Sequence, residues 1–138
     1  YFGYSFCPDI CPIDLGRNME INSTLSNQND KPSNFFLTVD PVRDTPHRLK
    51  EYTDLLDESL IGLTGTIDQI EIAKKNFMVY GSKSTSDENY LVDHSTFTYL
   101  IDGQGKLLRY FKRQDTPSYI KETIECLIDT AENKHGLI

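Results

Sequence analysis

The chain of 138 residues is long enough for one folded domain, and its hydrophobic fraction of 38% and charged fraction of 25% are those of a globular protein rather than a disordered one. Its net charge of −7 argues against a nucleic-acid partner and against docking on anionic lipid, because both surfaces attract cations. No apolar run approaches the roughly 20 residues that a membrane-spanning helix needs.

The first sixty residues predict two buried strands, each followed by a helix. The apolar, aromatic segment 1–6 is typical of a buried strand, and Pro12 is expected in the first turn of the next helix. Segment 35–39 predicts the second strand, and Thr45 is a candidate cap for a helix that begins at Pro46. The apolar positions expected on these helices are Ile13, Met19 and Leu25 on the first and Leu49, Tyr52 and Leu56 on the second.

The remaining predicted elements are a strand over 60–63, a helix capped by Thr66, a short strand over 78–80, an exposed loop over 81–89, a hairpin of strands 97–101 and 107–111, and a helix that begins at Pro117. Strands and helices alternate up to the hairpin, which indicates a parallel sheet finished by antiparallel strands. We therefore predict a thioredoxin-like α/β fold, a central mixed sheet flanked by helices, in a single domain over residues 1–138. The sequence opens as if in the middle of a strand, so we expect a fragment whose first strands and N-terminal anchor are absent.

Two cysteines stand at the predicted turn between the first strand and the first helix. Cys7 and Cys11 lie four residues apart and are bracketed by Pro8 and Pro12. Open α/β sheets place their sites at such carboxyl ends of strands, and helix N-terminal amides stabilise a thiolate. Two thiolates on one loop suit either a disulfide or a soft metal ion such as Cu(I).

His94 is the candidate third ligand. It precedes the strand 97–101, and in a thioredoxin-like layout the loop before that strand faces the cysteine loop. An imidazole there completes a site of two sulfurs and one nitrogen. Asp9 and Asp93 flank these residues, and Asp93 is a candidate to orient His94 or to add an oxygen ligand. The alternative for each aspartate is an ordinary position in a turn, without a role at the site.

Other residues with reactive side chains lack such support. Cys126 is expected to be a semi-buried structural cysteine of the last helix, and His47 and His135 are expected to be exposed to solvent. Arg43 is expected to tie its loop to a carboxylate, either Asp44 or Asp40.

Four segments together resemble the Sco/SenC family, and the resemblance runs from Tyr1 to about Ile128. They are Tyr1-Phe2-Gly3-Tyr4-Ser5-Phe6-Cys7-Pro8-Asp9-Ile10-Cys11-Pro12, the stretch Asp40–Pro46, Leu63-Thr64-Gly65-Thr66, and Asp93-His94-Ser95-Thr96. Phe6 stands where relatives often carry a polar residue or histidine, and Gly16 is unusual in the first helix. Neither departure removes a ligand.

The resemblance implies copper, Cu(I) or Cu(II), held by Cys7, Cys11 and His94, and a metallochaperone role in assembling the copper centre of cytochrome c oxidase. The implied partners are a copper donor protein and the copper-bearing subunit of that oxidase. The resemblance also implies a protein tethered to the inner membrane by an N-terminal anchor, facing the bacterial periplasm or the mitochondrial intermembrane space.

Three other functions remain open at this point. A peroxiredoxin-like thiol peroxidase needs a threonine three residues before its reactive cysteine, where Tyr4 and Pro8 stand here. A thiol–disulfide oxidoreductase has two rather than three residues between its cysteines, and Thr96 replaces the proline expected before the facing strand, yet a redox role is compatible with metal binding. A plain interaction domain leaves the coincidence of Cys7, Cys11 and His94 unexplained.

Overall fold

The computed structural model describes residues 1–27, 31–83 and 91–135; the side chains of Ser82, Lys83, Asp93 and residues 131–135 lie outside that description. Three strands pair in parallel in the order β1-β2-β3, namely β1 (Phe2–Gly3), β2 (Phe35–Thr38) and β3 (Ile61–Leu63). Because the strands are parallel, their carboxyl ends meet at one edge of the sheet. The loops that follow β1 and β2 therefore lie next to each other.

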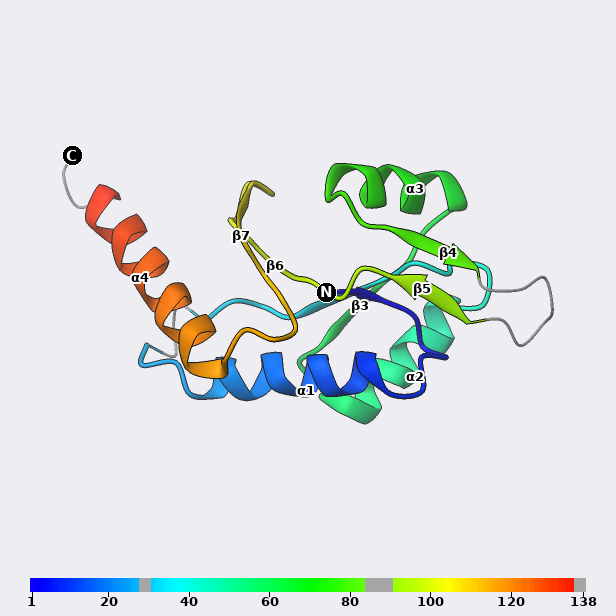
Figure 1. The fold of residues 1–138 in the computed structure, drawn as a ribbon, viewed down its shortest axis with the longest axis horizontal. Helices are drawn as coiled ribbons and strands as arrows, with labels where there is room; N and C mark the ends of the chain where they lie inside the picture. Colours follow the sequence, from blue (N-terminus) through cyan, green and yellow to red (C-terminus); the bar gives the residue numbers. More distant parts are fainter. Residues whose placement is uncertain (28–30, 84–90, 136–138) are drawn as a thin grey trace.

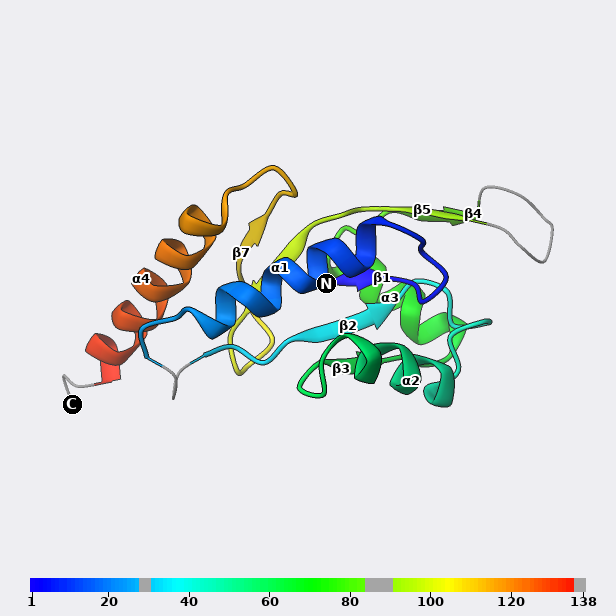
Figure 2. The ribbon, with the colours of Figure 1, turned by 90° about the horizontal axis from the view of Figure 1, so that it is seen from below.

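Each of these three strands is followed by a helix, and the helices cover both faces of the parallel sheet. They are α1 (Ile10–Ser23), α2 (Pro46–Leu56) and α3 (Ile67–Asn76). Figures 1 and 2 show α1 and α2 on one side of the strands and α3 on the other. Both predicted caps are confirmed: the Thr45 side chain accepts from the Arg48 amide, and Thr66 forms a capping box with Gln69.

Two antiparallel hairpins and a long helix complete the fold. Strand β4 (Gly81–Lys83) pairs with β5 (Val92–His94), β6 (Thr98–Ile101) pairs with β7 (Leu107–Phe111), and α4 (Pro117–His135) ends the chain. Parallel and antiparallel pairs form separate ladders over the described residues. Strand–helix units followed by a hairpin and a helix are the predicted thioredoxin-like layout. No described helix has the length and apolarity to cross a membrane.

Three apolar clusters hold these elements together. One joins β1 to β2 and β5, through Phe2, Tyr4, Val39, Val79 and Val92. The second lies between α1, β2 and α2, and contains Cys11, Leu15, Phe36, Leu49 and Leu60. The third fixes α4 against the end of α1 and β7, through Ile21, Leu25, Phe111, Ile120 and Ile124. Cys11 thus belongs to the core as well as to the candidate site.

The first strand and helix differ from the prediction. The backbone leaves the ladder after Gly3, and the Cys7 amide donates to the Tyr4 carbonyl at 3.1 Å, which closes a turn where a strand was predicted. Helix α1 begins at Ile10, and its buried face consists of Cys11, Asp14, Leu15, Asn18 and Ile21. Ile13, one of the apolar residues that predicted this helix, is 59% exposed, because the face that carries Cys11 packs inward.

The predicted strand over 78–80 is also wrong. Met78 has a left-handed backbone (φ 52°), and the Val79 amide donates to the Lys74 carbonyl, so these residues end α3. The strand begins at Gly81, within the segment 81–89 that was predicted to be a loop. The rest of that predicted loop, 84–90, lies outside the described residues.

Candidate metal centre

The two cysteines of the β1–α1 turn differ in their exposure to solvent. Cys7 lies in the turn and is half-buried, whereas Cys11 is the second residue of α1 and its exposed fraction is 0%. Asp9 occupies the N-cap position but makes no side-chain capping hydrogen bond. Neither sulfur forms a disulfide. One thiol therefore faces solvent at the rim while the other forms the floor of the site.

Gly3 allows the Cys11 sulfur to lie directly against strand β1. A Cβ at position 3 would come within 2.8 Å of the Cys11 Sγ and within 2.6 Å of Cε2 of Phe36, both too close for van der Waals contact. The absence of a side chain is therefore required by this close approach. Sequence patterns did not identify Gly3, because the requirement comes from packing between three separate segments.

His94 completes the cluster from the end of β5. Its Nε2 lies 3.5 Å from the Cys11 Sγ, and its Nδ1 lies 2.9 Å from the Ser95 carbonyl oxygen. A carbonyl only accepts, so Nδ1 carries a proton and donates to Ser95, which leaves Nε2 as the ring nitrogen that faces the sulfurs. The rings of Tyr1 and Tyr4 contact the imidazole edge-on, with centroids 6.3 and 5.7 Å away.

The structure brings the predicted residues Cys7, Cys11 and His94 together. Their sulfur and nitrogen atoms all lie within 4.8 Å of one another. Two sulfurs and an imidazole form a soft, low-coordinate donor set, which suits Cu(I) better than a hard, oxygen-seeking cation such as Mg²⁺ or Ca²⁺. The donor set therefore fits the copper ion that the sequence predicted.

The two thiols are also electrostatically different. The hydrogen bond from the Cys11 thiol, helped by His94 and by the backbone amides of Cys11 and Asp9, holds the pKa of Cys7 well below its usual value. The same hydrogen bond, together with burial, raises the pKa of Cys11. The metal-free pair thus contains one thiolate, at Cys7, and one thiol.

A buried carboxylate fixes the turn that carries Cys7. Asp44 is fully buried, and it accepts hydrogen bonds from the Ser5 amide at 3.0 Å, the Ser5 hydroxyl at 2.5 Å and the Thr38 hydroxyl at 2.6 Å. Its own carbonyl accepts from Thr64 at 2.9 Å. One side chain therefore joins the ends of β1 and β2. Arg43 pairs with Asp40, which was one of the two predicted partners.

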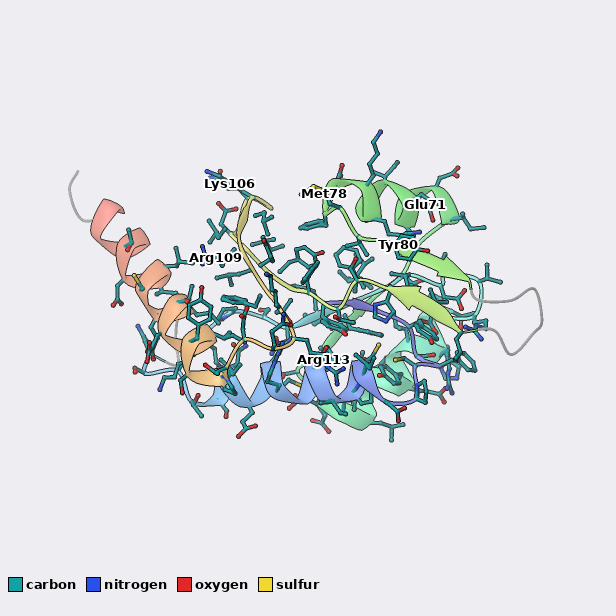
Figure 3. All side chains as sticks on the ribbon, in the orientation of Figure 1. Glu71, Met78, Tyr80, Lys106, Arg109 and Arg113 are labelled. Atoms are coloured by element: carbon teal, nitrogen blue, oxygen red, sulfur yellow. The ribbon has the colours of Figure 1, made fainter. Side chains whose placement is uncertain are left out.

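A second buried carboxylate lies on the other side of the site. Asp14, one turn after Cys11 on α1, accepts from the Tyr1 hydroxyl at 3.0 Å, and Nε of Arg113 lies 3.4 Å from its other oxygen. Figure 3 shows Arg113 beside α1; it is the second residue after the end of β7. Burial, together with Cys11 and Asp14, raises the pKa of Tyr1, so its ring stays neutral beside His94.

Of the other predicted residues whose side chains the structure describes, none joins the cluster. Cys126 is exposed rather than semi-buried, because it points away from the face of α4 that packs on α1. His47 is exposed as predicted, with Glu51 at 3.7 Å. The side chains of Asp93 and His135 lie outside the described residues, so their predicted roles stay predictions.

The comparison with protein families gives one match that spans nearly the whole chain. The family described as SCO1/SenC matches residues 1–129. Protein SenC of Rhodobacter capsulatus is 41% identical over 133 residues, which are 96% of this chain and 60% of that protein. The mitochondrial protein SCO2 of Saccharomyces cerevisiae is 39% identical over an alignment of 142 positions, which covers 97% of this chain and 47% of that protein. The chain thus spans about half to three fifths of the length of these relatives.

Solved structures give the same result for the fold. The copper-bound ScoI of Arabidopsis thaliana superposes with a TM-score of 0.83 at 30% identity, covering 94% of this chain and 82% of that one. Yeast Sco1 superposes with a TM-score of 0.84 at 36% identity, with the same coverage. Copper-bound yeast Sco1 gives a TM-score of 0.78 at 36% identity, covering 96% of this chain and 74% of that one.

Proposed function

The chain belongs to the SCO1/SenC family, and from that premise we propose that it holds one copper ion through Sγ of Cys7, Sγ of Cys11 and Nε2 of His94. We further propose that it passes this ion on during assembly of the copper centre of cytochrome c oxidase. The observation that carries the proposal is the convergence of these three donor atoms within 4.8 Å. Relatives of the same fold carry copper in their solved structures.

Each surrounding residue has a distinct part in this function. The Ser95 carbonyl accepts a hydrogen bond from the Nδ1–H of His94, which holds the proton on Nδ1 and leaves Nε2 to bind the metal. Asp44 holds the turn of Cys7 in place through Ser5. Tyr1 and Tyr4 cover the imidazole and limit the access of water. When bound, copper supplies a soft cationic centre that can move from these thiolates to those of a partner.

A redox role is the second candidate, and the lowered pKa of Cys7 favours it. A thiolate attacks a disulfide, whereas a thiol does not. The Cys7 thiolate would attack a partner disulfide and release one partner thiolate; the Cys11 sulfur, after losing its proton, would then displace the second. The partner gains two electrons, the proton lost by Cys11 goes to one released partner thiolate and water protonates the other, and Cys7 and Cys11 become a disulfide. Metal binding and thiol exchange would use the same two sulfurs.

The proposal extends to domain organisation, partners and location. We propose that residues 1–138 form a single copper-binding domain, which works with a copper donor protein and with the copper-bearing subunit of the oxidase. The domain would face the periplasm or the mitochondrial intermembrane space from a tethered position. Two relatives support this setting by their descriptions, one as a mitochondrial SCO2 protein and one as a Bacillus anthracis lipoprotein.

The decisive experiment is a copper titration of the fully reduced protein. We expect one Cu(I) per chain in the wild type, and an affinity about 10- to 100-fold lower in His94→Ala when a calibrated Cu(I) chelator competes. His47→Ala is the matched control, because that histidine is exposed and pairs only with Glu51. Equal copper affinity in His94→Ala and the wild type would rule out the assignment of His94.

A further inference from the structure

An exposed aromatic ring lies between two guanidinium groups beside the metal centre. Phe6 directly precedes Cys7 and is 46% exposed. The guanidinium carbon of Arg43 lies 4.7 Å from the centroid of its ring, and that of Arg48 lies 4.8 Å from it. Val42, 60% exposed, is next to Arg43 in the chain. We call these four residues, Phe6, Val42, Arg43 and Arg48, the cationic rim.

Near the cationic rim, the negatively charged side chains are buried and a positively charged one is exposed. The carboxylates of Asp40 and Asp44 are buried, with exposed fractions of 2% and 0%, and they point their oxygens at protein donors. Arg48, in contrast, is exposed. Arg48 is therefore the outward charge of this region, while the two carboxylates face inward, although the chain carries a net charge of −7. Asp9 is also exposed, on the turn of Cys7, and its charge opposes that of Arg48.

Two hydrogen bonds hold the backbone and the side chain of Arg48 in place. Its amide is bound by the Thr45 cap of α2, and its Nε donates to the Ser5 hydroxyl at 3.3 Å. Because Nε donates to Ser5, the guanidinium group is held with its carbon 4.8 Å from the centroid of the Phe6 ring, and its two terminal nitrogens are not used in the bond to Ser5. This arrangement is the pre-organised fork that binds carboxylates in a bidentate manner.

We propose that the cationic rim is a docking surface for a protein partner that presents carboxylates around its own thiol or metal site. The apolar surfaces of Phe6 and Val42 provide contact area, and the Arg48 fork provides charge selectivity next to Cys7. This part of the inference rests on the proposed function: the partner would be the protein that exchanges copper or electrons with Cys7. A second copy of this chain is the alternative occupant, since it is itself acidic.

The test uses reduced, metal-free protein and two synthetic peptides, each closed by one disulfide. The peptides differ only in the four residues that flank the cysteines, Asp in one and Lys in the other. The Cys7 thiolate attacks a peptide sulfur; a mixed disulfide forms, the peptide disulfide breaks, and the released thiolate takes a proton. Initial rates are measured by mass spectrometry at low salt and normalised to those of a neutral small thiol with the same peptides.

We expect the normalised Asp/Lys rate ratio to exceed one, to fall about two- to fourfold in Arg48→Gln, and to approach one at high salt. Arg48→Lys should retain part of the preference, because it keeps the charge and loses the fork. Lys50→Gln is the matched control: it removes one exposed positive charge from the same helix, where Lys50 pairs with Asp54, and should leave the ratio unchanged.

Two results would overturn the proposal. A ratio at or below one in the wild type would mean that the net charge of −7 governs the approach of partners. A salt-sensitive dimer in analytical ultracentrifugation, abolished by Arg48→Gln, would assign the rim to a second copy instead. Because no copper is present, failure of the copper-binding proposal would leave these rates unaffected, so the two hypotheses fail separately.

Discussion

Asp44 accepts hydrogen bonds from both the amide and the hydroxyl of Ser5, across 39 positions of sequence. Ser5 lies two residues before Cys7, so the second strand–helix loop holds the first in place. This contact explains why the chain leaves strand β1 after Gly3 and turns toward the site. The position of the reactive sulfur therefore depends on a carboxylate that is not itself a ligand.

Ser5→Ala tests the importance of this contact. The change leaves Asp44 buried with one donor fewer, and we expect it to lower the free energy of unfolding by about 1–3 kcal/mol. Chemical denaturation of the metal-free protein measures the loss. The Cu(I) affinity should fall as well, because the turn that carries Cys7 loses its anchor. Ser59→Ala, on an exposed turn, is the control and should change the stability by about 0.5 kcal/mol or less.

Gly3→Ala should disturb the floor of the site. The added methyl group would come within 2.8 Å of the Cys11 Sγ, so either strand β1 or that sulfur must move. We expect a stability loss of about 1–3 kcal/mol together with weaker copper binding. Gly16→Ala is the contrast, since a Cβ there meets no atom within 4 Å and Ala favours the helix. A wild-type copper affinity in Gly3→Ala would show that the close contact does not position Cys11.

Alkylation should distinguish the two thiols by their response to pH. The pKa of Cys7 is lowered in the folded protein, so its thiolate persists as the pH falls, whereas the raised pKa of Cys11 keeps that group protonated. The iodoacetamide rate at Cys7 should therefore be nearly constant between about pH 6 and pH 8, where an ordinary thiol slows about 100-fold on acidification. Peptide mapping assigns the label. A Cys7 rate that follows the ordinary thiol would contradict the assigned thiolate.

Cys126→Ser should leave copper binding unchanged. Cys126 is exposed on α4, far in sequence from both site cysteines, and it is outside the cluster of donor atoms. We expect one Cu(I) per chain and the wild-type affinity in this variant. Loss of copper from a folded Cys126→Ser protein would show that a third thiol takes part.

The sequence allowed the three candidate ligands to be predicted, but not the residues that support them. Cys7, Cys11 and His94 carry chemistry that residue type and topology reveal. Gly3 and Asp44 act through contacts between distant segments, which no local pattern encodes. Asp44 was considered only as a partner for Arg43, and that arginine pairs with Asp40 instead.

The same distinction explains the errors in secondary structure. Caps such as Thr45 and Thr66 are local signals, and both helices begin where these residues predict. Ile13 helped to mark helix α1 by its hydrophobicity, but its side chain is 59% exposed, so hydrophobicity alone did not indicate which face is buried. The burial of the Cys11 face decides the rotation of that helix, and this burial depends on Phe36 and Leu49 in other segments.

The last prediction concerns the oxidation state of the cysteine pair. Cys7, in the turn before α1, and Cys11, in the first turn of that helix, have their sulfurs in the same cluster, and neither forms a disulfide. Oxidation to a disulfide would consume both sulfur donors and leave His94 alone, and a single imidazole does not retain Cu(I). Copper loading should therefore follow the reduction state of this pair, and bound copper should protect it from oxidants.

We expect protein with a verified Cys7–Cys11 disulfide to take up less than about a tenth of an equivalent of Cu(I), and to reach one equivalent after reduction. Mass spectrometry maps the bridge, and copper is quantified on the same sample before and after the reductant is added. A Cys7→Ser/Cys11→Ser double variant is the control, because it should stay unloaded in both conditions. Full copper occupancy in the verified disulfide form would place the metal at other residues, since neither sulfur would then be available as a thiolate.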